Sequence, residues 1–209
     1  MTTDEPPRAR SSTRTRAAIL AAARTRFAAD GYERATIRAI AADATIDPSM
    51  VMRYFGSKEQ LFAAAVDIDL RLPDLTSVPP EELARVCVQH FLRRWEGDPS
   101  DDALLVLLRS AVTNPIAAQR MRDIFVQQVT PALMTVLGPD EAAERAGLVA
   151  CQLLGLALGR YLLEIPAVAS QPVAALVERY APAVRAVLAP EPPRERSPSP
   201  SPEPARDRR

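Results

Sequence analysis

The chain has 209 residues, of which 47% are apolar and 25% are charged, and its formal net charge is zero. These values are ordinary for a soluble globular protein of one medium or two small domains, long enough to bury a real core. No apolar run reaches the roughly 18 to 20 residues of a membrane span, and the polar start lacks the apolar segment of a signal peptide. We therefore expect a cytoplasmic protein with no membrane partner.

The zero net charge conceals an uneven distribution. From Arg8 to Lys58 there are ten basic residues against four acids, a balance of +6, whereas residues 61–190 carry eleven against fifteen, a balance of −4. A basic first quarter on a mildly acidic remainder indicates that one end of the molecule meets an anion. A merely solvated basic face is the alternative.

Nearly the whole chain is predicted to be helical, because alternating strand patterns are absent. A disordered arm over 1–11 precedes a first helix, which Ser11, Ser12 or Thr13 caps and which runs to about Asp30, with Gly31 as its stop. The apolar stripe of this helix is expected to comprise Leu20, Ala23 and Phe27.

Three shorter helices follow. Thr36 caps the second, Asp47 caps the third with Pro48 at its first position, and Ser57 caps a fourth that runs toward Leu72. The apolar residues of the second helix, at i, i+3, i+4 and i+7, are Ile37, Ile40, Ala41 and Ala44. The three prolines between Pro73 and Pro80 then interrupt the helical pattern.

The remainder predicts five further helices and a tail. The helices cover about 81–96, 101–113, 116–137, 140–164 and 172–188, and Pro131 and Pro182 are expected to kink or split two of them. The Pro- and Ser-rich stretch 190–209 is expected to be disordered. The predicted fold is all-α with about nine helices: a three-helix helix-turn-helix domain at 12–62 and a helical C-terminal domain at 63–189.

The second and third helices form a helix-turn-helix layout over Thr36–Phe55, since two short helices joined by about four residues follow a longer one. In this arrangement the last helix enters the major groove of DNA. Ser49, Met52 and Arg53 share its outer face, with Met50 and Tyr54 at the edges. Ile46, Val51 and Phe55 are expected to pack against Ile37, Ile40 and Phe27. A helical bundle with a solvated third helix is the alternative.

Four segments carry a more specific pattern: FAADGY at 27–32, ATIRAIA at 35–41, VMRYF at 51–55 and SKEQLF at 57–62. Together they resemble the N-terminal domain of TetR/AcrR-family regulators over residues 14–62, with the spacing of that family and no gap. The resemblance implies a homodimeric transcriptional regulator that binds palindromic half-sites of a double-stranded DNA operator. It also implies a repressor released by a small apolar or amphipathic effector, bound in a C-terminal effector-binding and dimerisation domain. An activator, or an effector-binding scaffold without classical repression, is the alternative.

The same resemblance implies roles for single residues. Thr36 and Lys58 match positions that contact phosphates, and Ser49 and Met50 match early recognition-helix positions where phosphate and base contacts are made. The full set of expected DNA-binding residues is Thr36, Thr45, Asp47, Ser49, Met50, Met52, Arg53, Tyr54 and Lys58.

Some of these positions leave alternatives open. Arg53 either reads a guanine edge or turns back to a phosphate or to Asp47. Thr45 stands where the family usually has glycine, so that a positive φ there strains the threonine or the turn is rearranged. Met52 replaces a usual tyrosine, and Gly56 replaces a proline or another non-glycine residue, which predicts a looser joint before the fourth helix.

Two further sites are expected in the C-terminal domain. Gly147, Cys151, Gly155 and Gly159 recur every four residues along 140–164, a helix that is apolar nearly all round. This predicts a symmetric four-helix dimer interface formed by the last two long helices, or close packing within the domain. The other free thiol, Cys87, is expected to be buried, as is Cys151.

An effector pocket is expected among the helices between Leu61 and Leu137, although each candidate also suits a core position. Its candidate residues are His90, Phe91, Trp95, Leu107, Met121, Phe125 and Gln128.

Catalytic chemistry is not expected. His90 is the only histidine, and Gly155 and Gly159 lie inside a helix instead of forming a phosphate-binding loop. We therefore expect no enzyme, no cofactor and no metal.

Overall fold

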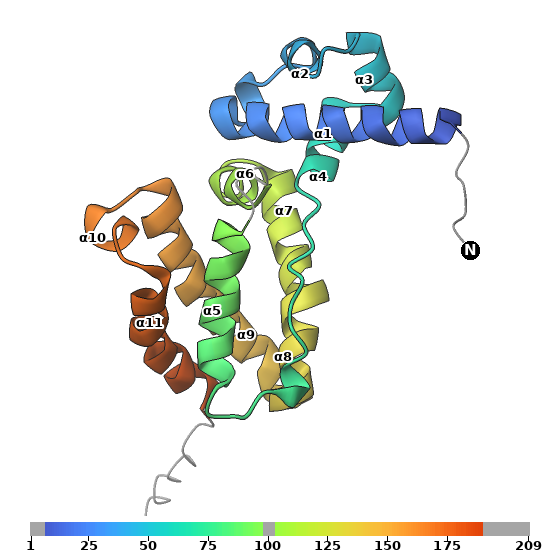
Figure 1. Cartoon of the computed structure of the whole chain (residues 1–209). Helices are drawn as coiled ribbons and strands as arrows, with labels where there is room; N and C mark the ends of the chain where they lie inside the picture. Colours follow the sequence, from blue (N-terminus) through green and yellow to red (C-terminus); the bar gives the residue numbers. More distant parts are fainter. Residues whose placement is uncertain (1–6, 98–102, 190–209) are drawn as a thin grey trace, which may run out of the picture.

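The computed structural model describes the backbone of residues 7–97 and 103–189, and the side chains within these ranges from residue 12 onward. Helices make up two units that lie one above the other in Figure 1. Most of the expected N-terminal arm and the whole expected tail at 190–209 lie outside the described residues.

The first unit is formed by α1 (Pro7–Arg34), α2 (Ile37–Asp43), α3 (Pro48–Phe55) and α4 (Lys58–Ala65). The predicted start of α1 at residues 11–13 is wrong, since the helix already begins at Pro7, where a fixed φ and a missing N–H suit a first helical position. The predicted stop is confirmed: Gly31 leaves the helical conformation, with φ 74° and ψ 169°.

The second unit contains α5 (Leu83–Glu96), α6 (Ala103–Ser110), α7 (Pro115–Ile124), α8 (Thr130–Leu137), α9 (Pro139–Ala157), α10 (Pro166–Ala169) and α11 (Val173–Leu188). A short 3₁₀ turn at Leu75–Ser77 precedes α5, and the four-residue helix α10 was not predicted. At Pro131 the expected disturbance takes the form of a π-helical turn, Phe125–Val129, which joins α7 to α8. This widening fits a proline, which has no amide hydrogen to bond the carbonyl four residues earlier. A second π turn, Leu158–Leu162, extends α9.

The prediction that the fourth helix runs toward Leu72 is wrong, because α4 ends at Ala65. Residues 66–74, here named the strap, run down beside α7 and α8 without helical structure (Figure 1). Arg71 in the strap has a positive φ of 51°, and Leu72 precedes a proline, which disfavours helix. The strap connects the first unit directly to the second.

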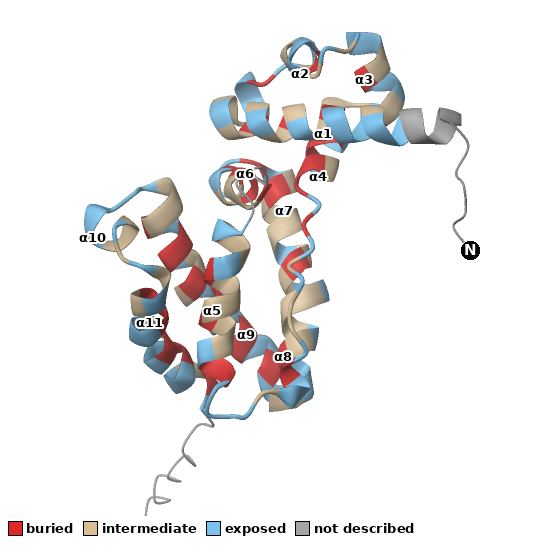
Figure 2. Cartoon of the chain, viewed as in Figure 1, coloured by how far each residue is buried: buried red, intermediate tan, exposed pale blue. Residues whose placement is uncertain are grey.

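Two apolar clusters hold the units together, and their buried residues lie on the inner faces of the helices in Figure 2. The first joins α1–α4 to α6 and α7, and the second joins α5, α8, α9 and α11. The buried stripe of α1 differs from the prediction by one residue: Ile19, Ala23 and Phe27 are fully buried, and Leu20 only partly. Their i, i+4, i+8 spacing keeps one face of the helix against the core.

The helix from Pro139 to Leu162 is long and apolar enough to cross a membrane by composition alone, with a mean hydropathy of 1.2 over its best window, contrary to the sequence-based expectation. Half of that window is buried inside the fold. Since α9 packs against α8 and α11, this composition is accounted for by a core helix.

Candidate functional site

The first candidate site is the unit α1–α4, here named the reading head. Val51 and Phe55 of α3 are buried in one cluster with Ile40 of α2 and Phe27 of α1, while Ile37 and Ile46 pack at its margin. The expected inner face of the helix-turn-helix is therefore confirmed. Arg26 of α1 also bonds both carboxylate oxygens of Asp43 at the end of α2, at 2.8 and 2.6 Å. This pair links α1 to the end of α2, and the apolar cluster holds α3 against both helices.

The caps at the start of α2 and α3 are formed by the expected residues. Thr36 Oγ1 accepts the Ala39 N–H at 3.1 Å. Asp47 Oδ1 accepts both the N–H of Ser49 at 2.8 Å and its hydroxyl at 2.5 Å, and these bonds lower the pKa of Asp47. A DNA contact in which the Ser49 hydroxyl acts as donor therefore has to replace its bond to Asp47.

The outer face of α3 carries the side chains expected to meet DNA. Ser49, Met52 and Arg53 are exposed, Met52 to 43%, and Met50 and Tyr54 are half-buried at the edges. Among the described residues, Arg53 forms no hydrogen bond or ion pair, and the Asp47 carboxylate is bonded to Ser49 instead. The guanidinium is thus presented to solvent beyond the packed core.

Lys58 lies at the first position of α4, beside the end of α1. Its Nζ donates to the Glu33 carbonyl at 3.2 Å and lies 4.4 Å from the centroid of the Tyr32 ring. The Tyr32 hydroxyl donates to Glu59 at 3.1 Å, and burial together with this bond raises the Tyr32 pKa to about 12. The ammonium is therefore positioned at a helix N-terminus, where positive charge and free N–H groups attract anions.

Gly56 was predicted to loosen the joint before α4, but the structure has a tight turn there. Its φ of 78° and ψ of −56° form a γ-turn in which the Ser57 N–H donates to the Phe55 carbonyl at 2.9 Å. A Cβ at this position would collide with the Gln60 side chain. Glycine thus permits a tight turn here, and Ser57 then caps α4 through its Oγ.

Thr45 has the positive φ that the family's glycine suggests, at 55°. A β-branched residue is strained in this region by about 1–2 kcal/mol. Glycine removes this strain, but it also increases the conformational entropy of the unfolded chain, which offsets part of the stabilisation. We expect Thr45→Gly to raise the free energy of unfolding by about 0.5–1 kcal/mol, a Tm increase of roughly 1–4 °C. Ala42→Gly, at an exposed position inside α2, is the control and should lower the Tm. A lower Tm for Thr45→Gly would show that the turn is not strained.

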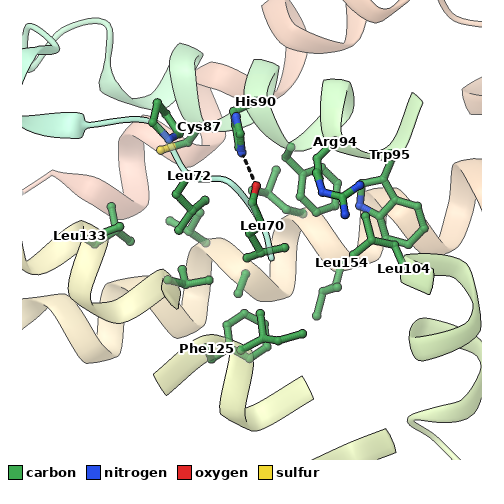
Figure 3. Close-up of a pocket in the computed structure, with 18 of the residues that line it drawn as sticks. Leu70, Leu72, Cys87, His90, Arg94, Trp95, Leu104, Phe125, Leu133 and Leu154 are labelled. Carbon is green, nitrogen blue, oxygen red and sulfur yellow. Dashed lines mark hydrogen bonds between the residues drawn. The ribbon is translucent and has the colours of Figure 1, made fainter. Parts of the chain in front are cut away.

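The second candidate site is a cavity of about 130 Å³ in the second unit (Figure 3). Six of the seven expected effector-pocket residues line it: His90, Phe91, Trp95, Leu107, Met121 and Phe125. Lining residues that sequence reasoning missed include Leu70 and Leu72 of the strap, which was expected to be helical, and Leu153 and Leu154 of α9, the helix assigned to dimerisation.

The seventh expected residue, Gln128, bonds the strap from outside the lining. Its Nε2 donates to the Ile68 carbonyl and its Oε1 accepts the Leu70 N–H, both at 2.8 Å. His90 Nε2 donates to the Leu70 carbonyl at 3.0 Å, as Figure 3 shows. The backbone of Leu70, a wall of the cavity, is therefore held on both sides by side chains.

Two structural links join the cavity walls to the reading head. Helix α6, which contributes Leu104 and Leu107 to the cavity, packs on α1, and Arg109 donates to the Ala28 carbonyl. The strap continues from α4, where Arg24 of α1 donates to the Ala65 carbonyl at 2.9 Å and Asp67 pairs with Arg120 of α7. Both walls of the cavity are therefore bonded to the reading head or to the helix that precedes the strap.

The expected dimer residues lie partly on one exposed face of α9. Gly147, Cys151 and Gly155 are exposed, so the expectation of a buried Cys151 thiol is wrong for the single chain. Gly159 is buried and does not belong to the exposed face, because the Ile165 side chain covers it. Cys87 is half-buried, and burial raises its pKa to about 11.

Several solved structures share this architecture. A TetR-family regulator from Streptomyces coelicolor A3 is 29% identical, with a TM-score of 0.54 over 84% of this chain and 95% of that one. A TetR-like transcriptional regulator from Rhodococcus sp. RHA1 is 22% identical, with a TM-score of 0.56 over 83% and 93% of the two chains. The fatty acid degradation regulator FadR from Bacillus halodurans shares the fold at 15% identity, with a TM-score of 0.63 over 81% and 97%. No protein of curated function matches the chain.

Two family models together account for both units. Residues 19–65 match the model described as bacterial regulatory proteins, tetR family, and residues 81–188 match the tetracyclin repressor-like C-terminal domain. The first covers the reading head from residue 19 onward, and the second covers α5 to α11, including most of the cavity lining. The chain therefore belongs to the tetR family of bacterial regulatory proteins, which are DNA-binding transcriptional regulators.

Proposed function

We propose that this regulator is a cytoplasmic repressor that binds palindromic half-sites and leaves its operator when a small effector occupies the cavity. The observation that carries the proposal is the exposed face of α3, where Ser49, Met52 and Arg53 stand beyond a fully packed head. A recognition helix presents side chains to base edges in this way. The basic balance of the head supports contact with the DNA backbone.

An effector acts through the walls that it touches. Its occupancy of the cavity favours a conformer in which α6 and the strap are displaced, and both elements are bonded to the reading head. The effector shifts the equilibrium by its difference in affinity for the two conformers and by nothing more. The proposed inducing step is a change in the spacing of two heads, which have to match two half-sites about one DNA turn apart.

The two heads are brought together through α9. Its exposed face combines small residues, Gly147, Cys151 and Gly155, with Leu148, which is 50% exposed. A Cβ added at Gly147 or Gly155 would meet no atom of the described residues within 4 Å, so a second helix can approach closely there. Burying this face in a symmetric dimer removes its apolar surface from water.

We expect Leu148→Arg to convert the protein from a dimer to a monomer, because an arginine at the contact would be buried without a partner. Analytical ultracentrifugation at micromolar concentration measures the change. Val112→Arg is the matched control, since Val112 is 89% exposed and lies outside α9, and it should remain a dimer. A monomeric wild-type protein under these conditions would contradict the proposed interface.

A gel-shift assay on the promoter beside the protein's own gene tests the repressor proposal. The protein should retard this duplex at a lower concentration than a scrambled duplex of the same length, and should do so as a dimer. Equal affinity for both duplexes would favour the alternative, an effector-binding scaffold.

A further inference from the structure

The chemistry of the cavity lining restricts what it can hold. Leu70 and Leu72 of the strap, Phe91 and Trp95 of α5, and residues of α6, α7 and α9 surround it with carbon atoms (Figure 3). The ring centroids of Phe91 and Trp95 lie 5.9 Å apart, so two aromatic faces form adjoining walls. Such a lining attracts apolar surface and offers little to a hydrated group.

Among the described residues, three ionisable side chains line the cavity, and none of them is a carboxylic acid: Cys87, His90 and Arg94. His90 Nε2 is bonded to the Leu70 carbonyl at 3.0 Å, and Arg94 Nε donates to the Asp69 carbonyl at 3.3 Å. The raised pKa of the Cys87 thiol keeps it neutral at pH 7. A cation would find no countercharge among these groups. Arg94 is only partly buried and already donates to the Asp69 carbonyl, so a carboxylate held within the apolar lining would lose hydration that the lining does not replace.

The size of the cavity sets a second limit. At about 130 Å³ it is close to the roughly 150 Å³ apolar cavity that is known, in another protein, to stay dry and bind benzene. Water is a poor occupant, since a buried water needs two to four polar partners and the polar groups here bond to the protein. The space suits one ring with small substituents.

We propose that the ligand of this cavity is an uncharged apolar molecule of about one substituted ring. The inference rests on the proposed effector function for its biological meaning, but it concerns the ligand class and is tested separately. Ring faces of the ligand lie against Phe91, Trp95 or Phe125, and its edge contacts Leu70 of the strap. Binding is driven by the apolar area removed from water.

Isothermal titration of the full chain with ethylbenzene, benzoate and benzylammonium tests the class. These probes share a benzene ring and differ mainly in charge. Ethylbenzene should bind and raise the Tm, and the two ions should bind at least tenfold more weakly. Benzoate or benzylammonium binding as tightly as ethylbenzene would overturn the proposal, and so would the absence of ethylbenzene binding to folded protein.

A pair of variants ties binding to the cavity. Phe125→Ala enlarges it and should improve the affinity for naphthalene, a two-ring probe, at least tenfold over the wild type. The matched control is Val126→Ala, at the next residue, whose side chain is 69% exposed. This variant should leave the affinities for ethylbenzene and for naphthalene unchanged. Circular dichroism verifies that both variants are folded. If folded Phe125→Ala and the wild type bound naphthalene with equal affinity, the aromatic probes would not bind in the cavity that Phe125 lines. This result would overturn the proposal.

The same samples separate the ligand class from the effector function when operator affinity is also measured. If ethylbenzene binds and operator affinity is unchanged, the ligand class stands and the effector function fails. If benzoate binds more tightly than ethylbenzene and releases the operator, the effector function stands and the class proposed here is wrong.

Discussion

Replacing Arg53 by alanine should weaken binding to the cognate operator by about 1–3 kcal/mol per half-site, and binding to a scrambled duplex much less. Arg53 is exposed on the outer face of α3 and pairs with no other side chain in the described part of the chain, so its guanidinium can reach guanine O6 and N7. Fluorescence anisotropy with both duplexes at several salt concentrations measures the two losses. An equal loss on both duplexes would place specificity with Ser49, Met50, Met52 or DNA shape.

Lys58→Ala serves as the comparison for Arg53→Ala, because it removes an expected phosphate contact instead of an expected base contact. Lys58 at the start of α4 is expected to contact a phosphate, which carries no base identity. Its removal should lower cognate and scrambled affinity by the same factor and flatten the salt dependence by about one unit per half-site. Because the ammonium also bonds the Glu33 carbonyl, thermal unfolding of this variant separates loss of contact from loss of stability.

Phe62→Ala should destabilise the reading head by about 3–5 kcal/mol, the cost of removing a fully buried phenylalanine. Phe62 is 0% exposed, and its ring lies edge-on to Phe27 and Tyr32, with centroid distances of 5.0 and 4.9 Å. The loss removes the packing of α4 on α1, so DNA binding should fail at temperatures where the wild type still binds. Urea unfolding followed by circular dichroism measures the free energy.

Phe62→Leu is the matched control, because it keeps most of the apolar volume and loses mainly the two ring contacts. Such contacts are worth about 0.5–1.5 kcal/mol each, so the loss should be clearly smaller than for alanine. A cost below about 1 kcal/mol for Phe62→Ala, against the usual range for such truncations, would show that α4 is not part of the head's core.

The helix-turn-helix could be predicted because its signals are local. Thr36, Asp47 and Ser57 cap helices within three residues of themselves, and the apolar residues of α2 and α3 recur at helical spacing. The positive φ of Thr45 was also suggested by the position that it occupies. Interactions between residues close in sequence therefore determine where most helices of the reading head begin and which faces they bury.

The strap could not be predicted, because its partners are distant in sequence. Gln128 bonds the strap at Ile68 and Leu70, 60 and 58 residues away, and these bonds replace the helical ones that the local pattern favours. Because residues 66–72 were predicted to be helical, Leu70 and Leu72 were not expected in the cavity lining. The aromatic residues of the cavity were predicted from their residue type. Helix α10 has four residues, too few for a periodic pattern.

In vitro selection of random duplexes by the full chain tests whether α3 reads DNA sequence. We expect enrichment of an inverted repeat whose halves lie about one helical turn apart, bound by a dimer. Arg53→Ala should relax the preference at one base pair in each half. A folded, dimeric protein that enriches no motif over the starting pool would show that α3 does not read DNA sequence.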